Sequence, residues 1–420
     1  MAYPKGLLGK VAVRENLYKA WEDISRYSRP LSHGVSEQTI QDFRANRNEQ
    51  LEDIRRKLTS GLYIFSPVRA VTIDKKGGKK RPLRIADIRD RVVQRAMARV
   101  LEKYFSKSFS LDNQASHAYL KNKGVQTAIK RMLLFHQSNC RYIFEADIVN
   151  FFDTVNTERL LKDMIFPNLP DTTLNSLLYD ALHMEIGNKE NLPEEDWDLF
   201  PDSSTGLPQG GYLSPLFSNI YLSGFDNKML DAQFHLIRYA DDFIVMCESF
   251  SEAENAFELA REILEGDLGL SLHPRDDKNP KARTRIIRVS QKPVSFLGIQ
   301  FNGSRIWPSS EKRQVLTKKI AQLGKSRNVQ TLLASMNNLL EGWAAAYSFT
   351  VLNWKYTNKI DNEVNKILWN SLSTLGWKLQ PKYLSQEQRN NSGVIPISDH
   401  VNKFRRDMHD RELFSKYWGK

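Results

Sequence analysis

Hydrophobic and polar positions alternate at helical spacing through much of the first 70 residues, most clearly over residues 41–58. Residues 68–73 are instead rich in β-branched side chains, which predicts a strand. Gly77-Gly78 then predicts a hairpin turn, because glycine accepts the positive φ that such turns require. The returning strand would cover residues 81–85, and a helix over residues 89–104 would follow it.

Two apolar segments in the middle of the chain carry acidic residues. Residues 141–147 form a mostly apolar run that ends in Asp147, which predicts a buried strand with an acid at its end. Residues 236–246 are two apolar runs separated by Asp241-Asp242, which predicts a second hairpin. Around them we expect helices over residues 157–186 and 252–268, a polar and acidic loop over 188–202, and a strand over 294–301.

The C-terminal part has a different pattern. Apolar positions between residues 311 and 347 recur at the spacing of two packed helices. Because mixed strands and helices come first and helices alone come later, the chain predicts an α+β core followed by a helical domain.

Composition narrows the class of protein. The 420 residues include two cysteines, Cys140 and Cys247, which excludes a disulfide framework and a cysteine-rich zinc site. No run of 18 or more apolar residues occurs, so no membrane span is predicted. Residues 1–10 do not resemble a signal peptide. We therefore expect a cytoplasmic protein in a reducing compartment.

Charge is distributed in three blocks. Residues 1–110 carry 24 basic and 12 acidic side chains, residues 111–280 carry 13 and 28, and residues 281–420 carry 24 and 9. Two basic parts flanking an acidic one suit a polyanionic partner, because each neutralised phosphate releases counterions. The acidic part would repel such a partner unless cations were bound there. Taken alone, each charged run better fits an ordinary solvated surface, and it is the block pattern together with the motifs below that favours a polyanionic partner.

The adjacent acids Asp241 and Asp242 are the strongest chemical signal. Like charges between two buried runs repel each other, so the pair predicts a bound cation. Mg²⁺ is the natural candidate, because it prefers carboxylate oxygens and keeps waters and phosphates as its other ligands. Nucleotidyl transfer uses two such ions roughly 4 Å apart, which requires a further carboxylate, and Asp147 is the best supplier. The pair by itself would also fit a solvated turn.

Three blocks of the sequence stand out, residues 144–153, 206–215 and 238–242. Further motifs lie at residues 80–85, 90–94, 272–278 and 296–298 and at the pair Gly342-Trp343. Together these motifs resemble the reverse transcriptases, most closely those of the bacterial group II intron type. They occur in family order over roughly residues 30–350. The resemblance implies a right-hand polymerase fold with fingers over residues 1–140, a palm over 141–305, a helical thumb over 306–375 and a basic extension over 376–420.

The resemblance also implies the catalytic and metal-binding residues. Two Mg²⁺ ions would be held by Asp147, Asp241 and Asp242, and the family pattern adds Ile148 to this metal site. Phe152 would lie under the nucleotide sugar, where a bulky ring clashes with a 2′-hydroxyl and so selects deoxynucleotides. Of Phe151 and Phe152, one would be an ordinary core residue.

Further residues of the resemblance would bind the incoming dNTP. Gln209 and Gly210 would line it, with glycine allowing close approach of the backbone. Lys75 and Arg81, on the two arms of the basic hairpin, would hold the triphosphate, and Arg84 would assist. Lys278 falls where the family has a lysine near the leaving pyrophosphate.

Template and primer would contact the thumb and the end of the palm hairpin. Lys312, Lys318 and Lys319 lie beside the apolar stripe of residues 311–347, and such a basic helix face can follow a phosphate backbone. Tyr239, just before the paired acids, is the other expected contact. An ordinary amphipathic helix would show the same pattern in residues 311–347.

Two departures from the intron pattern bear on the biological role. Residues 116–125 replace the block that intron proteins typically have before the first catalytic acid, and look more like the stand-alone reverse transcriptases of anti-phage defence. The acidic loop over residues 188–202 is a second departure. The resemblance therefore implies an enzyme that copies a dedicated non-coding RNA encoded nearby, with an RNA template, an RNA/DNA hybrid product and no membrane partner. An intron maturase lacking an endonuclease is the main alternative, and a non-catalytic RNA-binding scaffold is another.

Overall fold

The computed structural model describes residues 6–74, 78, 80–200, 205–279, 281–326, 328–374 and 384–418. They form two compact units, each made of several chain segments. Unit 1 comprises Met1–Asn122, Glu145–Val245 and Glu254–Arg285, and unit 2 comprises Lys123–Phe144, Met246–Ala253 and Ile286–Lys420. The domain boundaries expected after residues 140, 305 and 375 remain a prediction.

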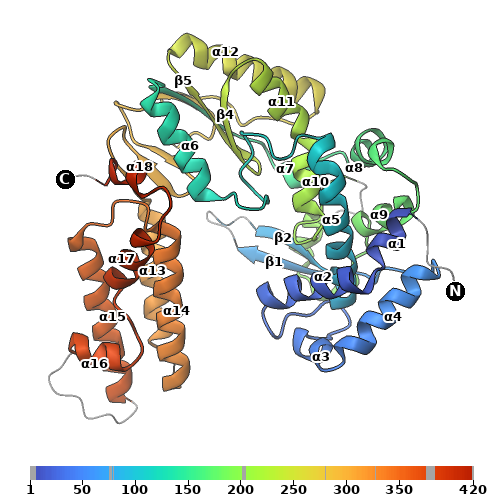
Figure 1. The fold of residues 1–420 in the computed structure, drawn as a ribbon, viewed down its shortest axis with the longest axis horizontal. Helices are drawn as coiled ribbons and strands as arrows, with labels where there is room; N and C mark the ends of the chain where they lie inside the picture. The colour runs from blue at the N-terminus through green and yellow to red at the C-terminus, as the bar shows by residue number, and fades with distance from the viewer. Residues whose placement is uncertain are drawn as a thin grey trace. The chain divides into compact units, whose positions relative to one another are not determined.

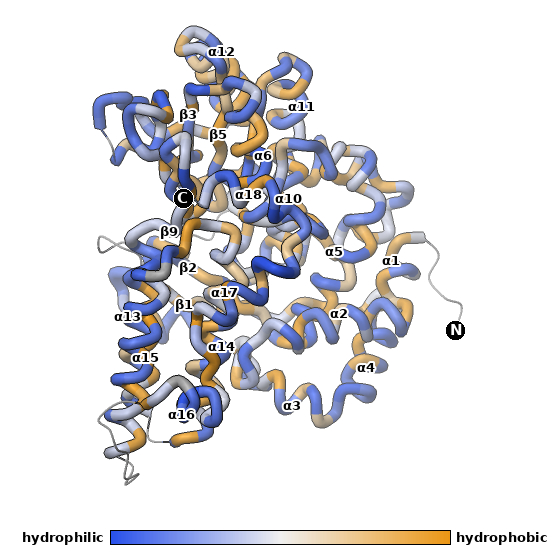
Figure 2. The backbone as a smooth tube through the Cα atoms, turned by 60° about the vertical axis from the view of Figure 1, so that its left-hand side comes forward, coloured by the Kyte–Doolittle hydropathy of each residue, from blue (hydrophilic) through white to orange (hydrophobic). Residues whose placement is uncertain are grey.

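Unit 1 begins with helices, as the apolar spacing predicts. The predicted helix over residues 41–58 is broken into two helices at Asn46. The first of the two begins with a capping box between Thr39 and Asp42. Hydrophilic and hydrophobic stretches alternate along these helices (Figure 2). The helices are α1 (Gly6–Val11), α2 (Arg14–Tyr27), α3 (Ile40–Ala45), α4 (Arg47–Thr59) and α5 (Ile88–Ser108).

The basic hairpin is present. Strands β1 (Arg69–Asp74) and β2 (Lys80–Ile85) pair antiparallel, with Asp74 opposite Lys80 and Arg69 opposite Ile85. Most of the turn between them lies outside the described residues, including Lys75 and Gly77.

The acids are carried by a four-stranded sheet in the order β4-β5-β3-β6. Apolar side chains of β3 and β5 are buried, which accounts for the largely apolar runs that predicted these strands. Its strands are β3 (Tyr142–Asp147), β4 (His235–Tyr239), β5 (Asp242–Cys247) and β6 (Arg285–Arg288) (Figure 1).

The helix predicted over residues 157–186 is wrong as a single element. Pro167 lies in a short 3-10 turn and Pro170 in the loop that follows, and proline removes helical hydrogen bonds, so the segment breaks before α9 (Asn175–Leu182). The predicted loop over residues 188–202 contains two 3-10 turns, Lys189–Asn191 and Glu194–Leu199. The other helical elements here are α7 (Phe151–Thr154), α8 (Thr157–Arg159), η1 (Leu160–Ile165), α10 (Ser214–Tyr221), α11 (Ser223–Asp231), α12 (Phe250–Arg261) and η5 (Glu262–Asp267).

Unit 2 contains a small antiparallel sheet where a single strand was expected. The predicted strand over residues 294–301 is wrong, because Leu297 and Gly298 have φ of 52° and 78° and turn the chain between β7 (Val294–Phe296) and β8 (Ile299–Phe301). Strand β9 (Ile306–Pro308) completes the sheet in the order β7-β8-β9.

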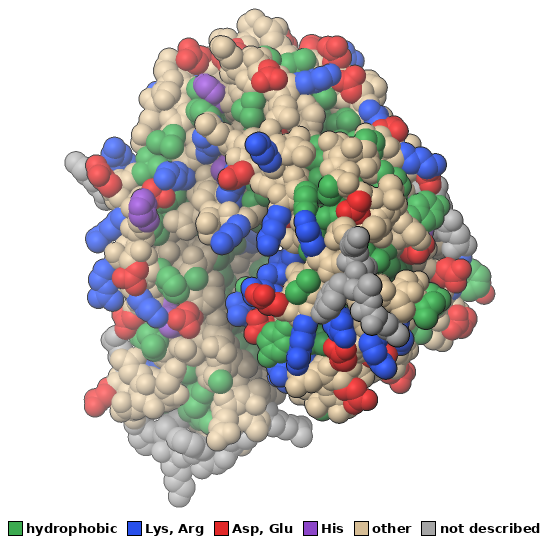
Figure 3. Space-filling model, turned by 45° about the vertical axis from the view of Figure 1, so that its right-hand side comes forward, with side chains coloured by type: hydrophobic (Ala, Val, Ile, Leu, Met, Phe, Trp, Pro, Cys, Tyr) green, Lys and Arg blue, Asp and Glu red, His purple; other side chains and the backbone are tan. Residues whose placement is uncertain are grey.

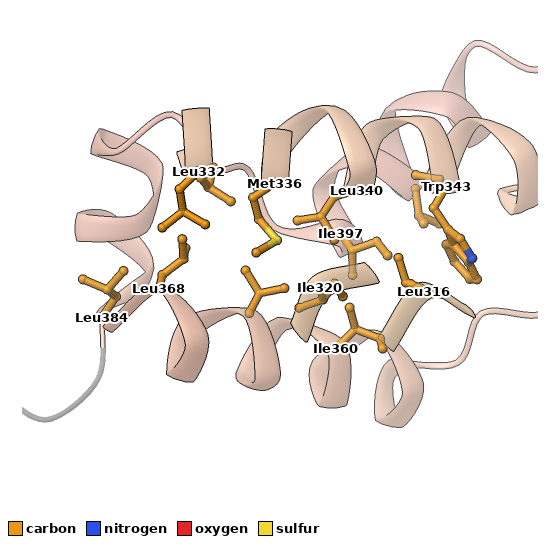
Figure 4. Packing of buried hydrophobic residues seen from close by; sticks show 14 of the residues in the cluster. Leu316, Ile320, Leu332, Met336, Leu340, Trp343, Ile360, Leu368, Leu384 and Ile397 are labelled. Atoms are coloured by element: carbon orange, nitrogen blue, oxygen red, sulfur yellow. The ribbon is translucent and has the colours of Figure 1, made fainter. Parts of the chain in front are cut away.

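Two helices follow this sheet, as predicted for residues 311–347. Helices α13 (Ser310–Leu323) and α14 (Val329–Tyr347) pack with α15 (Trp354–Thr374) and α17 (Ile397–Arg406) around one hydrophobic cluster. Met336 and Leu340 of α14 lie across the cluster from Ile320 of α13 (Figure 4). The remaining helices of unit 2 are α6 (Val125–Gln137), α16 (Gln386–Asn391) and α18 (Arg411–Ser415).

The observed fold is α+β, as expected. No helix of the described residues is long and apolar enough to cross a membrane. Cys140 and Cys247 are both buried and are not joined. On the face shown in Figure 3, Lys and Arg side chains are numerous and are interspersed with Asp and Glu.

Candidate active site

The paired acids lie at the turn between β4 and β5. Ala240 has a φ of 58°, so the turn uses a backbone conformation that non-glycine residues seldom adopt. The buried Arg238 supports this turn, because its Nη1 donates to the Ala240 carbonyl at 2.9 Å. Its other guanidinium nitrogens bind both oxygens of Asp226 at 2.6 Å. The turn that carries Asp241 and Asp242 is thus supported by the buried ion pair of Arg238 and Asp226, which the sequence analysis did not identify.

A segment far away in the sequence borders the same hairpin. Arg238 N donates to the Ala115 carbonyl and His117 N donates to the Arg238 carbonyl, both at 2.8 Å. This pairing places the start of the divergent residues 116–125 along β4. Partial burial and, to a smaller extent, the nearby charge of Asp241 raise the pKa of the Tyr119 phenol. The segment that departs from the intron pattern is therefore part of the site.

Asp147 ends β3, which neighbours β5 in the sheet. Its Oδ2 accepts a hydrogen bond from Arg283 Nη1 at 2.7 Å and lies 3.8 Å from His273 Nε2. Asp242 reaches the surface, but its pKa is raised to about 7. The larger cause is desolvation by the surrounding protein, and the smaller is repulsion from Asp147 and Asp241. The three acids therefore share one electrostatic environment.

Whether these acids suit a metal can be judged from their partners. Among the described residues, no group of three or more His, Cys, Asp or Glu side chains lies close enough to hold an ion. The repulsion on Asp242 and the cationic Arg283 against Asp147 nevertheless mark a place that favours positive charge. The donor oxygens are of the type that Mg²⁺ prefers. The residues fit the ion in chemistry, provided that Arg283 leaves Asp147 and the carboxylates turn together.

Ile148 has a buried side chain, so only its backbone could face an ion. It pairs as an isolated bridge with Leu272. The hydrogen bonds of this pairing come from the neighbouring residues, with His273 N donating to the Asp147 carbonyl at 3.2 Å and Val149 N to the Ser271 carbonyl at 2.8 Å. This pairing places His273 beside the acid at the end of β3.

A cavity of about 930 Å³ in unit 1 brings together residues that lie far apart in the sequence. Its size is near the upper end of the range for small-molecule sites, roughly 300–1,000 Å³. It is also lined by Asp23 and Arg95 of the N-terminal helices. The sequence-predicted residues that line it are Arg81, Phe152, Gln209, Gly210 and Asp241.

Phe151 and Phe152 have different roles, as expected. Phe151 is 1% exposed and belongs to the core, whereas Phe152 is half-buried and lines the cavity. The two rings meet edge to face with centroids 5.5 Å apart. The Phe152 carbonyl accepts from Leu207 N at 2.7 Å, which ties the aromatic residue to the segment carrying Gln209.

Gln209 and Gly210 dock against the basic hairpin through the backbone. Arg84 N donates to the Gln209 carbonyl at 2.9 Å. Gly210 has a φ of 104°, and a Cβ there would lie 3.1 Å from the Arg84 carbonyl oxygen, so both its conformation and its neighbour favour glycine. The Gln209 side chain donates to Asp153 at 3.0 Å. Arg84 therefore contributes its backbone, and its side chain is not among those lining the cavity.

Other predicted site residues lie elsewhere in the structure. Lys278 is exposed on a loop whose backbone is capped by Asp276, and it does not line the cavity. Tyr239 is half-buried at the end of β4. Lys75 lies outside the described residues. Lys312, Lys318 and Lys319 are exposed on α13 of unit 2.

Paired acids at a hairpin turn, a third acid on the neighbouring strand and a basic hairpin beside a nucleotide-sized cavity define the site of a template-directed nucleotidyltransferase. Residues 73–301 match the model of the reverse transcriptase (RNA-dependent DNA polymerase) family, and the chain belongs to this family. The family is that of the RNA-dependent DNA polymerases.

Its relatives include bacterial and intron-encoded proteins. The chain is 30% identical to protein YkfC of Escherichia coli over 287 residues, which are 58% of this chain and 71% of YkfC. It is 29% identical to the group II intron-encoded protein LtrA of Lactococcus lactis over 228 residues, 54% of this chain but 35% of LtrA. Among solved structures, apo telomerase from Candida tropicalis is similar with a TM-score of 0.44, at 12% identity over 89% of this chain and 72% of that one. The chain thus spans about a third of LtrA, and its sequence relatives are group II intron-like.

Proposed function

We propose that this protein adds dNTPs to a 3′ end on an RNA template at the site formed by Asp147, Asp241 and Asp242. The observation that carries the proposal is the single cavity lined by Asp241, Phe152 and Arg81. An acid for metal binding, an aromatic ring for the sugar and a guanidinium for phosphate then surround one space of nucleotide size.

The residues around the cavity divide the work of binding a nucleotide. Arg81 would hold the triphosphate, since a guanidinium binds phosphate oxygens in a bidentate manner. The ring of Phe152 would lie against the sugar and exclude a 2′-hydroxyl, while the Gly210 backbone would approach the nucleotide closely. Two Mg²⁺ ions, when bound to the three acids with Ile148 alongside, would stabilise the charge on the attacking and leaving oxygens. Lys75, Arg84 and Lys278 would complete the dNTP contacts.

Arg283 would keep Asp147 paired until the ion binds. It carries the positive charge closest to that carboxylate among the contacts of the described residues, at 2.7 Å, and its side chain is 59% exposed. An exposed arginine can leave at small cost, because ion pairs at the surface contribute about 0–1 kcal/mol. Exchange of the guanidinium for a metal ion would then keep a positive charge beside Asp147.

The template-primer would contact Tyr239 and the basic face of α13 with Lys312, Lys318 and Lys319. These lysines are exposed, and the Lys312 stem lies close enough to Gly298 that a Cβ there would meet it at 2.6 Å. Lys312 is thereby held at the β7–β8 turn, while Lys318 and Lys319 are available to phosphates of the RNA/DNA hybrid.

For the biological role we propose copying of a dedicated non-coding RNA in anti-phage defence, in the cytoplasm. The divergent residues 116–125 support this assignment, since their sequence departs from the intron-type block and their first residues, Ser116 and His117, pair with Arg238 of β4 next to the acid-bearing turn. The alternative, a maturase and reverse transcriptase without an endonuclease, is supported by the named intron proteins among the relatives. A flanking intron at the gene would favour the alternative.

The proposal is tested by labelled dNTP incorporation on a primed RNA template with Mg²⁺. The double variant Asp241→Ala, Asp242→Ala should lose about 10³-fold or more of the wild-type rate, because bound ions supply several kcal/mol of transition-state stabilisation. Asp198→Ala, which removes an exposed acid of unit 1, is the matched control and should keep the rate. Equal incorporation by the double variant and the control would refute the assignment of the acids.

A further inference from the structure

A group of acidic residues that precedes Gln209 in the chain has no part in the proposed chemistry. We call residues 188–199 the acidic segment; it contains Glu190, Glu194, Glu195, Asp196 and Asp198. It follows a stretch that pairs with the basic hairpin: Val68 N donates to the Glu185 carbonyl at 2.7 Å and Gly187 N to the Val68 carbonyl at 2.9 Å. The Asn188 side chain then bonds both backbone groups of Ala70, at 2.7 and 3.2 Å. The acidic segment is therefore attached to β1.

One acid of this segment is buried against the hairpin. Asp196 is 2% exposed, and its two oxygens accept from Lys80 Nζ at 2.7 Å and Thr72 Oγ1 at 3.1 Å. Exposed Glu195 accepts from the same Lys80 Nζ at 3.0 Å. Hydrogen bonds to Asp196 and then Glu195 raise the pKa of Lys80, so the ammonium is held in its charged form. Asp196 thus joins β1, through Thr72, to β2, through Lys80.

The acidic segment and the cavity lie on opposite faces of the hairpin. Successive side chains of a strand point to opposite faces. On β2, Arg81 and Leu83 line the cavity, whereas Lys80 between the turn and Arg81 bonds Asp196. Thr72 is paired with Pro82 in the register and so shares the face of Lys80. Asp196 consequently supports the back of the hairpin whose front carries Arg81.

We propose that Asp196 is a positioning residue that holds the β1–β2 hairpin so that Arg81 faces the incoming nucleotide. A two-stranded hairpin is marginally stable by itself and needs packing on one face to stay ordered. The buried carboxylate provides this packing without touching the substrate. The claim that Arg81 binds a nucleotide rests on the proposed function. The claim that Asp196 holds the hairpin in place does not.

Steady-state kinetics separates positioning from catalysis. Asp196→Asn should raise the KM for dNTP about 10-fold, equivalent to ~1.4 kcal/mol of binding, with kcat within about 2-fold of wild type because the acids are untouched. Asp198→Asn, an equal change of charge at an exposed position of the same turn, should leave both constants unchanged. In an Arg81→Ala background, Asp196→Asn should raise KM no further, since its effect passes through Arg81. A full additional rise in that background, or a fall in kcat with unchanged KM, would overturn the proposal.

A second measurement needs no polymerase activity. The rate of trypsin cleavage at the lysines of residues 75–80 reports how firmly the hairpin is held. Asp196→Asn should be cut there about 10-fold faster than wild type at equal thermal midpoint, and Asp198→Asn should not. Faster cutting in a protein that incorporates no dNTP would uphold the positioning role and refute the proposed function. Unchanged cutting would refute the positioning role even if the enzyme is active.

Lys80→Met provides a second variant in case Asp196→Asn does not fold. The Lys80 side chain is 28% exposed, so Lys80→Met removes the same ion pair from its more exposed side. The same rise in KM and in cleavage is expected, and wild-type values in a folded Lys80→Met protein would contradict the role of this pair.

Discussion

At the scale of single residues, Arg238 shows how a buried charge can serve geometry. Its side chain is 1% exposed, and an unpaired guanidinium there would be very costly. Asp226 neutralises it, while Asn219 and the Ala240 carbonyl accept its remaining hydrogen bonds from Nη1 at 3.1 and 2.9 Å. A fully bonded arginine behind the turn keeps Asp241 and Asp242 in position although Ala240 has a positive φ.

Phe152 offers a test of sugar selection at the same scale. Phe152→Val should raise the use of rNTP relative to dNTP about 10-fold or more, because removing the ring removes the clash with a 2′-hydroxyl. The measurement is the ratio of kcat/KM values for the two nucleotides. Phe151→Leu is the matched control: it alters the buried neighbour and should lower stability without changing the ratio. An unchanged ratio in Phe152→Val would contradict the sugar-contact role.

Asp90 offers a test by pH. It is fully buried, accepts from Tyr63 OH at 2.6 Å and Ser66 N at 3.1 Å, and burial raises its pKa from 3.8 to about 6. Because the folded pKa lies above the unfolded one, its stabilising contribution is present below about pH 4 and is lost as the pH rises to about 6.

The free energy of unfolding of the wild type, minus that of Asp90→Asn, should therefore fall between about pH 4 and pH 6 by as much as about 3 kcal/mol. Above about pH 7 the difference should be constant. Urea titrations of both proteins at each pH measure it, and parallel curves across the whole range would mean that Asp90 titrates normally.

At the scale of elements, short turns decide where strands end. The apolar run over residues 294–301 reads as one strand, but Leu297-Gly298 folds it into two. A Cβ on Gly298 would lie 2.6 Å from Lys312 Cε, so the glycine also makes room for the first basic side chain of α13. A turn of two residues inside an apolar run leaves a weak sequence signal. The side chain that packs against this turn, Lys312, lies on another element and gives no local signal either.

Helix α13 carries the prediction for nucleic-acid binding. Lys318→Gln with Lys319→Gln should weaken binding of an RNA/DNA hybrid and reduce the slope of log affinity against log salt by about one to two, because each lysine that contacts a phosphate releases about one counterion. Filter binding at several salt concentrations measures the slope.

The control for α13 is Lys19→Gln with Lys162→Gln. Each of these lysines pairs with a glutamate four residues earlier in unit 1. The control should keep the wild-type slope, and an equal loss in both double variants would indicate nonspecific attraction instead of a defined contact on α13.

At the scale of the whole molecule, the acidic and basic parts of the chain correspond to different expected partners. Residues 111–280 hold the three acids of the site and an excess of negative charge, while residues 281–420, which form most of unit 2, have 24 basic and 9 acidic side chains. Basic and acidic side chains are mixed on the face in Figure 3. The net charge of unit 2 suits a polyanionic partner, and that of the acid-bearing part suits bound cations.

The identity of the RNA is the prediction that belongs to this scale. Protein purified from cells carrying its own genomic locus should retain one dominant short RNA encoded beside the gene. Sequencing the bound RNA and the DNA made from it measures this directly. Retention of an intron surrounding the gene would instead support the maturase alternative, and a random sample of cellular RNA would contradict both roles.

The sequence by itself predicted many of the local elements and the residues proposed for the chemistry. Helices α4 and α5, the basic hairpin and the acid-bearing strands follow from periodicity and β-branched content, because these features depend on near neighbours. Asp241 and Asp242 stand out because adjacent acids between apolar runs need a cation, and Phe152 and Gln209 because they lie in blocks that resemble those of the reverse transcriptases.

Tertiary structure alone decided which distant residues meet. Arg283 on Asp147, Asp226 behind Arg238 and Asp196 behind the basic hairpin are contacts across 136, 12 and 116 or more positions in the sequence, and each is made by a side chain whose type is common on surfaces. Periodicity reports which face of an element is buried, but it does not report against what. The partners were therefore settled by packing and by the need of each buried charge for an opposite charge.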